Sequence, residues 1–126
     1  MSTTVLIVDD HATFRATARL LLEAEGFQVV GEAENGQTAI ERAATLAPDL
    51  LLLDVQLPDI DGFQVSRRVT GTDGGPAVIL VSSREVGEFG PLVGASGACG
   101  FVSKAELSGE RLRALLGQDT RDGELA

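Results

Sequence analysis

The sequence predicts an α/β fold, a doubly wound (βα)5 three-layer sandwich built on a parallel five-stranded sheet. Five short apolar runs alternate with five intervening segments, an order that is typical of a parallel sheet covered by helices on both faces. The run at residues 50–53 is four consecutive leucines, which suits a strand that is buried on both faces. Four of the runs end on polar or charged residues. In open α/β sheets the carboxyl ends of the strands form the edge that binds ligands.

The five expected strands are rich in aliphatic and β-branched residues. The leucine run cannot extend into a helix, because Pro48 stands before it and a turn-forming stretch with Pro58 and Gly62 follows it. The second run is less apolar than the others and is expected to be a more exposed strand. The strands are expected at residues 4–8, 27–33, 50–54, 77–81 and 100–104.

Segments with helical signals follow these strands. In the first segment, Phe14, Ala18 and Leu22 recur at a spacing that places them on one face of a helix, and Gly26 ends the pattern. The later helices are bounded by capping residues or proline. They are expected between Asn35 and Pro48, from Asp61 to Val69, and from Ser108 to Leu116.

The segment between residues 84 and 100 is the exception, because its glycines weaken any helix by about 1 kcal/mol each relative to alanine. Pro91 lacks an amide hydrogen and is best tolerated in a first helical turn. We therefore expect a helix that starts late, near Gly90 or Pro91, or a partly irregular segment, with residues 86–89 in a loop.

Length and composition indicate one domain. The chain has 126 residues, of which 44% are hydrophobic, enough for a real core. No apolar run approaches membrane-spanning length, and no signal-peptide pattern precedes the first strand. The single cysteine, Cys99, excludes an internal disulfide, so a cytoplasmic location is expected. Residues 1–116 would form the domain, and residues 117–126 a polar, frayed tail that is too short for a second folded domain.

The polar residues that end the strands form a candidate site. Because the carboxyl ends of parallel strands share one edge, three carboxylates, a hydroxyl and the only lysine should meet there. Crowded carboxylates repel one another unless a cation joins them. A carboxylate set without a Cys or His cluster suits Mg²⁺, which leaves room for a phosphate oxygen, and the arrangement indicates phosphoryl transfer to an aspartate. The residues are Asp9 and Asp10, Asp54, Ser82 and Lys104.

These residues, in this order and at these spacings, resemble the receiver domain of two-component response regulators across about residues 4–116. The resemblance implies a sheet order of 2-1-3-4-5. It also implies that Asp54 is phosphorylated by a histidine kinase or a histidine phosphotransfer protein. The matching pieces are Val8-Asp9-Asp10-His11, Glu34-Asn35-Gly36, residues 53–62, Ser82 and Phe101-Val102-Ser103-Lys104.

The resemblance also implies a role for each matched residue. Asp10 and Asp54 would bind Mg²⁺ with the backbone carbonyl of Gln56, while Asp9 would hold a metal-bound water or contact the ion directly. Ser82 and Lys104 would contact the phosphoryl oxygens.

A switch is implied in the same way. Ser82 would move toward the phosphoryl group, and Phe101 would rotate into the space that it leaves. Serine lacks the methyl group that stiffens threonine, and phenylalanine has no hydroxyl to hold an outward rotamer, so we expect a loosely poised switch. The family commonly has proline after the lysine, whereas this chain has Ala105.

Other interpretations remain. A haloacid dehalogenase would need a second aspartate at Gln56, and a flavodoxin would need a phosphate-binding loop where this chain has two acids. A receiver that acts through protein contacts, without phosphorylation, is the main alternative. His11, the only histidine, is expected to line the mouth of the site or to be solvated.

The expected partners are the phosphodonor protein and a downstream protein or output domain outside this chain, and homodimerisation stays open. The net charge of −9 argues against direct nucleic-acid binding, and no membrane contact is expected. No enzymatic activity is expected beyond self-catalysed phosphoryl transfer to Asp54 and its hydrolysis.

Overall fold

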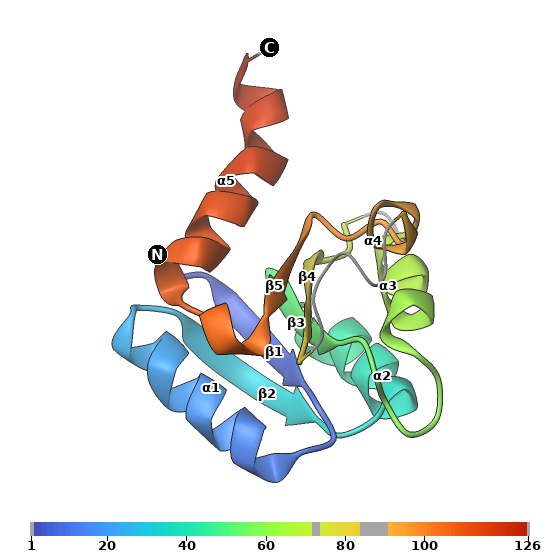
Figure 1. The fold of residues 1–126 in the computed structure, drawn as a ribbon. Coiled ribbons are helices and arrows are strands. Elements are labelled where there is room, and N and C mark those ends of the chain that lie inside the picture. Colours follow the sequence, from blue (N-terminus) through green and yellow to red (C-terminus); the bar gives the residue numbers. More distant parts are fainter. Residues whose placement is uncertain (1, 72–73, 84–90, 126) are drawn as a thin grey trace.

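Strands and helices alternate along the chain from β1 to α5 (Figure 1). The computed structural model describes residues 2–71, 74–83 and 91–125, so the loop predicted at residues 86–89 lies outside the described residues. The strands are β1 (Thr4–Val8), β2 (Gln28–Ala33), β3 (Leu50–Asp54), β4 (Ala77–Ser82) and β5 (Gly100–Ser103). The helices are α1 (Ala12–Ala24), α2 (Gly36–Leu46), α3 (Gly62–Thr70), α4 (Leu92–Ala95), the short 3-10 helix η2 (Lys104–Glu106) and α5 (Gly109–Leu125).

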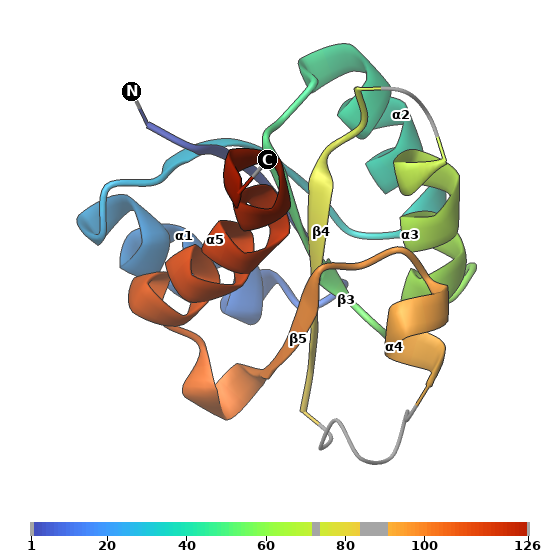
Figure 2. The ribbon, with the colours of Figure 1, turned by 90° about the horizontal axis from the view of Figure 1, so that it is seen from above.

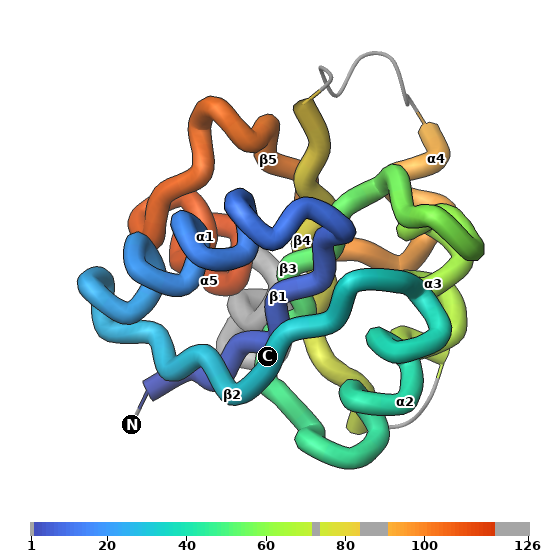
Figure 3. Tube along the Cα trace, turned by 90° about the horizontal axis from the view of Figure 1, so that it is seen from below, coloured from blue at the N-terminus to red at the C-terminus, as the bar shows by residue number. Residues whose placement is uncertain are grey.

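The five strands form one parallel sheet in the order β2-β1-β3-β4-β5, which confirms the predicted fold class and strand order. Helices α1 and α5 cover one face of the sheet, and α2, α3 and α4 cover the other (Figures 2 and 3). The molecule therefore has the three layers that the sequence predicts. Strand β3 lies in the middle of the sheet, which explains why its sequence is apolar without alternation.

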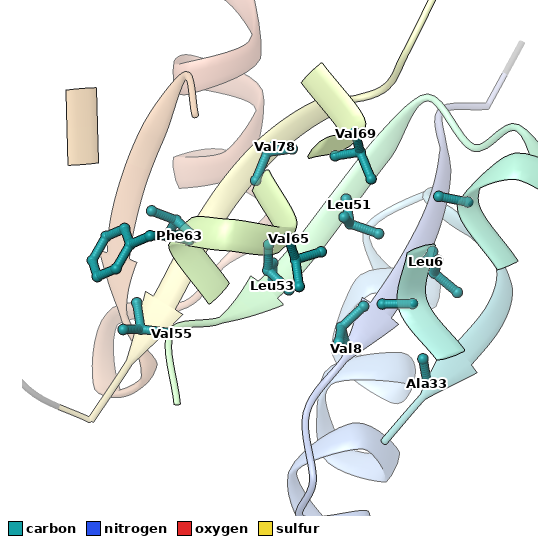
Figure 4. Close-up of a cluster of buried hydrophobic side chains, with 13 residues drawn as sticks. Leu6, Val8, Ala33, Leu51, Leu53, Val55, Phe63, Val65, Val69 and Val78 are labelled. Atoms are coloured by element: carbon teal, nitrogen blue, oxygen red, sulfur yellow. The ribbon is translucent and has the colours of Figure 1, made fainter. Parts of the chain in front are cut away.

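The leucines of β3 supply both halves of the core. Successive side chains of a strand point to opposite faces, so Leu51 and Leu53 pack under α2 and α3, while Leu50 and Leu52 pack under α1 and α5. Figure 4 shows the first cluster, in which Val65 of α3 lies over these leucines. All four leucines are fully buried, and each contributes about 1.5–3 kcal/mol of hydrophobic free energy.

Side-chain caps fix the starts of three helices, and the sequence predicted two of them, those by Asp61 and Ser108. Asn35 Oδ1 accepts a hydrogen bond from the Thr38 N–H at 2.8 Å at the start of α2. Asp61 caps α3 through the Gln64 N–H at 2.9 Å, and the Ser108 hydroxyl accepts the Arg111 N–H at 3.0 Å at the start of α5.

The start of α4 and the end of α5 bear on two further expectations from the sequence. Helix α4 begins at Leu92 with Pro91 as its N-cap, so the predicted late start is confirmed. Helix α5 continues through Leu125, and the frayed tail expected from Gly117 stays a prediction. No proline interrupts the stretch after Leu116, and the sequence therefore allows the helix to continue.

A substitution at Gly62 tests how tightly α3 meets the end of β3. A Cβ atom at Gly62 would lie 2.3 Å from the Asp54 backbone oxygen and 2.9 Å from Val55 Cα. Gly62→Ala should therefore lower the free energy of unfolding by about 1–3 kcal/mol in urea denaturation. Gly94→Ala is the matched control, because a Cβ atom there meets nothing within 4 Å. It should leave stability unchanged or raise it by up to about 1 kcal/mol. Equal effects of the two variants would contradict the packing argument.

Candidate functional site

Strand register brings the two buried acids together. Val8 of β1 pairs with Leu53 of β3, so Asp9 and Asp54, the next residue of each chain segment, are neighbours at the same edge of the sheet. The backbone N–H of Asp9 donates to the Ala33 carbonyl at 3.0 Å, which holds it in line with β1. Both side chains are buried. Register and burial thus place two carboxylates face to face at the end of the central strands.

Asp10 and His11 complete a cluster of possible ligands with these acids. One ligand atom from each of Asp9, Asp10, His11 and Asp54 lies within 4.8 Å of the other three. Asp10 is partly exposed, which leaves the cluster open to solvent on one side. The carboxylates that the sequence analysis grouped therefore do converge.

Lys104 is the positive charge of the site. It follows β5, and its Nζ lies 2.6 Å from Asp9 Oδ2 and 3.4 Å from Asp54 Oδ2. Partial burial would lower the pKa of Lys104, but its close contact with Asp9 and the charges of both acids outweigh burial and raise that pKa above its ordinary value. The ammonium is therefore closer to Asp9 than to the predicted phosphoacceptor, Asp54.

The environment of Asp54 disfavours its charged form. Burial is the largest cause and repulsion from Asp9 is the next, and together they raise the pKa of Asp54 to about 6. The Gln56 N–H, which donates to Asp54 Oδ1 at 3.2 Å, and the Lys104 charge act in the opposite direction. A cation added beside Asp54 would therefore favour its carboxylate form.

Ser82 lies on β4, next to β3, and Phe101 lies on β5, the strand beyond β4. Ser82 ends β4, is buried, and pairs in register with Ser103, the residue before Lys104. Phe101 of β5 is partly buried and packs against the core cluster beneath α3. The structure brings both residues to the correct strands, while their switching roles stay predictions.

A cavity of about 220 Å³ opens onto Asp54. Its lining includes Asp10, Gln56, Ser83 and Lys104, so the residue after Ser82 also borders this space. Metal binding by the backbone carbonyl of Gln56 stays a prediction. The cavity shows that Asp54, although buried on most sides, can be approached from one side.

A sequence model of the response regulator receiver domain matches residues 5–116. The chain belongs to the receiver domain family. Within the described residues, no helix is both long and apolar enough to cross a membrane.

Similar proteins include transcription regulators of bacteria. BvgA of Bordetella pertussis is 37% identical over 102 residues, which cover 81% of this chain and 49% of BvgA. The response regulator GacA of Pseudomonas aeruginosa is 34% identical over 112 residues, which cover 88% of this chain and 52% of GacA. The chain thus spans about half the length of these relatives. The signal receiver domain of NarL from Mycobacterium tuberculosis is 32% identical with a TM-score of 0.82, over 91% of this chain and 94% of that one.

The acidic cluster of this receiver domain resembles the magnesium site of the family. A small divalent ion takes oxygen ligands at about 2.1 Å, keeps several waters and needs only one or two carboxylates from the protein. Asp9, Asp10 and Asp54 supply these oxygens from one small region. Oδ2 of Asp9 has no hydrogen-bond donor of regular geometry among the described residues, although the Lys104 ammonium lies beside it. The residues present therefore fit a divalent cation.

Phe14 is a residue of this receiver site that the sequence analysis placed only in the core. The Lys104 ammonium lies 4.5 Å from the centroid of its ring, a cation–π distance. Phe14 belongs to α1, one helical turn after Asp10, and its ring is half-buried. The only signal in the sequence is this spacing, which equally suits a core residue.

Asp59 also has a contact that the sequence did not reveal. Its carboxylate accepts the backbone N–H groups of Gly36 at 2.7 Å and Gln37 at 2.9 Å, so it binds the start of α2. The Gly36 hydrogen bond is the main reason that the pKa of Asp59 lies below its ordinary value. The sequence indicates only a turn around Asp59. No local pattern points to its partner Gly36, which lies 23 residues away in the chain.

The raised pKa of Asp54 gives a pH-dependent stability. Its ordinary value is 3.8 and its value here is about 6, so between these pH values the folded state holds a proton that the unfolded state has lost. The contribution of Asp54 to the free energy of unfolding therefore falls as pH rises from about 4 to 6. Asp54→Asn removes this effect, so its stability relative to the wild type should grow by up to about 3 kcal/mol over that range. Urea denaturation with EDTA at each pH measures the difference, and a constant difference would contradict the assignment.

A double-mutant cycle tests the contact between Phe14 and Lys104. Phe14→Leu keeps an apolar side chain in the core but removes the aromatic ring, and Lys104→Met removes the charge. The two changes should show a coupling energy of about 0.5–2 kcal/mol in urea denaturation, because a partly buried cation gains this much from a ring. Strictly additive effects would show that Phe14 only fills space.

Proposed function

We propose that this receiver domain is a phosphoacceptor in a two-component phosphorelay. Asp54 would accept a phosphoryl group from a histidine kinase or a histidine phosphotransfer protein, with Mg²⁺ as the cofactor. The observation that carries the proposal is the convergence of Asp9, Asp10 and Lys104 on Asp54 at the mouth of a solvent-accessible cavity. Opposite charges around a buried nucleophile are what phosphoryl transfer requires.

The proposed transfer forms an acyl phosphate. The phosphorus–nitrogen bond of the donor's phosphohistidine breaks, its electron pair returns to the imidazole, and an Asp54 carboxylate oxygen bonds to phosphorus. Asp54 attacks as the carboxylate, and a cation bound beside it would favour this form by lowering the pKa that burial and Asp9 raise to about 6. Asp10, Asp54 and the Gln56 carbonyl would hold the Mg²⁺, with Asp9 in contact with the ion or with a water bound to it, and the ion would supply positive charge for the phosphoryl oxygens.

Lys104 changes partner in this mechanism. In the structure its Nζ is 2.6 Å from Asp9 and 3.4 Å from Asp54. If a metal ion held by the acids balanced the charge of Asp9, the flexible Lys104 side chain would be free to contact a phosphoryl oxygen on Asp54. The short distance between the two carboxylates means that the ammonium needs to move little.

The proposed response to phosphorylation uses Ser82 and Phe101. The Ser82 hydroxyl, at the end of the strand next to Asp54, would turn toward a phosphoryl oxygen. Phe101 lies on the adjacent strand and would move inward as Ser82 leaves its position. Phe101 is already partly buried against the core, so its rotation changes the surface near α4 without unfolding β5.

The output of this domain is also a proposal. The name of BvgA describes a transcription regulator, GacA is a response regulator, and this chain matches about half of the length of each. We propose that the phosphorylated domain acts in the cytoplasm on a protein partner or on an output domain outside this chain. Direct binding to nucleic acid is disfavoured by the net charge of −9. Receiver domains are generally regulators rather than enzymes, and Asp54 would turn over only its own phosphate.

Acetyl phosphate labelling tests the phosphoacceptor. With Mg²⁺, intact-mass spectrometry should show one added phosphoryl group on the wild type and none on Asp54→Asn. EDTA should prevent labelling, because the acids then repel the phosphate. Lys104→Ala should fold and lose most of its labelling rate.

Asp61→Asn is the matched control, because asparagine caps a helix as well as aspartate does and the residue lies outside the site. It should be labelled at the wild-type rate. Equal labelling of Asp54→Asn and the wild type would reject Asp54 as the acceptor. A folded, Mg²⁺-binding protein that no phosphodonor labels would favour the alternative, a receiver that acts through protein contacts alone.

A further inference from the structure

His11 points a nitrogen atom into the acidic cluster. It is the N-cap residue of α1, but its side chain makes no capping hydrogen bond. Its backbone N–H donates to Asp9 Oδ1 at 2.8 Å, which turns the residue toward the acids. Its Nδ1 lies 3.0 Å from Asp10 Oδ1 and 3.2 Å from Asp9 Oδ1, while 71% of the side chain is exposed. The imidazole therefore stands at the open side of the cluster with one nitrogen facing inward.

These distances match the spacing of ligands around one ion. Two neighbouring ligands of an octahedral ion, each about 2.1 Å from the metal, lie about 3.0 Å from each other. The nitrogen of His11 has this separation from both Asp9 and Asp10. Opposite ligands of such an ion lie about 4.2 Å apart, and the four ligand atoms of the cluster, Asp54 included, are all within 4.8 Å of one another. Small side-chain shifts would bring His11 onto the ion that the acids hold.

We propose that His11 is a metal ligand and makes this site selective for divalent transition-metal ions such as Mn²⁺, Co²⁺, Ni²⁺ and Zn²⁺. The inference rests on the proposed function, because it concerns the same cation site. Mg²⁺ is a hard ion that prefers oxygen and gains little from an imidazole. The affinity of transition-metal ions rises when a nitrogen ligand joins oxygen ligands. His11 thus adds affinity for one class of ion and leaves the other nearly unchanged.

This selectivity would decide which ion occupies the site when both classes are present. The three carboxylates alone supply the charge that any divalent ion needs, so phosphorylation with Mg²⁺ does not depend on His11. The exposed imidazole can rotate away from the cluster and leave the magnesium ligands in place. His11 is therefore a residue of metal specificity, separate from Asp54 and Lys104, which would contact the phosphoryl group.

Calorimetric titration of the whole 126-residue chain at one fixed pH tests this proposal. Ni²⁺ and Mg²⁺ serve as the two probes, and wild type, His11→Asn and Asp10→Asn are compared. Asparagine is a good N-cap residue, so His11→Asn should keep α1 intact, and thermal unfolding checks this. His11→Asn should weaken Ni²⁺ binding by about tenfold to a hundredfold. It should change Mg²⁺ binding by less than about twofold. Asp10→Asn should weaken the binding of both ions.

A spectroscopic measurement shows ligation directly. With Co²⁺, proton NMR of the wild type should contain a hyperfine-shifted, solvent-exchangeable imidazole N–H signal. This signal should be absent from His11→Asn and should disappear when excess Mg²⁺ displaces the Co²⁺. No other histidine is present to give such a signal.

Three results would overturn the inference. Unchanged Ni²⁺ affinity in His11→Asn, with Mg²⁺ still bound, would reject His11 as a ligand and leave the proposed function standing. Full Ni²⁺ affinity in Asp10→Asn would show that the ion binds an isolated surface histidine outside the acidic site. A wild type that binds neither ion would reject the inference together with the metal-dependent part of the proposed function.

Discussion

The repulsion between two buried carboxylates is the constraint on which the rest of the site depends. Asp9 and Asp54 are fixed side by side by the register of β1 and β3, and both are almost inaccessible to solvent. With Asp10, three carboxylates face one ammonium, which leaves two uncompensated negative charges in a region where water screens poorly. A divalent cation removes this imbalance. The repulsion among the carboxylates, which is unfavourable without a cation, therefore contributes to the affinity of the site for the ion. The buried leucines of β3 stabilise the sheet enough to tolerate that cost.

One side of the site is rigid, because the loop between β3 and α3 is held at several points. The Gly62 N–H donates to the Val55 carbonyl at 2.7 Å, and the absence of a side chain at Gly62 lets α3 lie against the end of β3. Asp61 caps α3, while Asp59 binds the start of α2. Gln56 lies within this loop, so its backbone is positioned by contacts on both sides of it. A ligand carbonyl that is fixed in advance binds a metal ion with little loss of entropy.

The fold and the carboxylates of the site could be predicted from the sequence because their signals are local. Four leucines in a row indicate a strand covered on both faces, and the residue that follows each strand must lie at the common edge. The positions of Asp54 and Lys104 at the ends of their strands therefore predicted that the two side chains lie in one site. The partners of individual side chains were not predictable in this way.

The contacts that the sequence analysis missed depend on how separate elements pack. Phe14 has the spacing of a core residue, and only the position of β5 relative to α1 reveals that its ring contacts the Lys104 ammonium. The sequence left His11 either at the mouth of the site or in solvent, and the structure places its ring nitrogen beside Asp10. In each case the residue type allowed two roles, and the tertiary structure selected one.

Strand β5 connects the site to both layers of helices. Phe101 packs against the cluster beneath α3, while Val102, on the opposite face of the strand, packs against the cluster beneath α1 and α5. Lys104 is the first residue of η2, the turn that leads into α5. Arg113 of α5 in turn donates a hydrogen bond to the Glu25 carbonyl, beyond the end of α1. A change of charge at Asp54 therefore acts on a strand whose two faces touch different helices, and a shift of β5 would alter both surfaces of the domain together. That geometry makes β5 a candidate route between the site and the helices on both faces of the sheet.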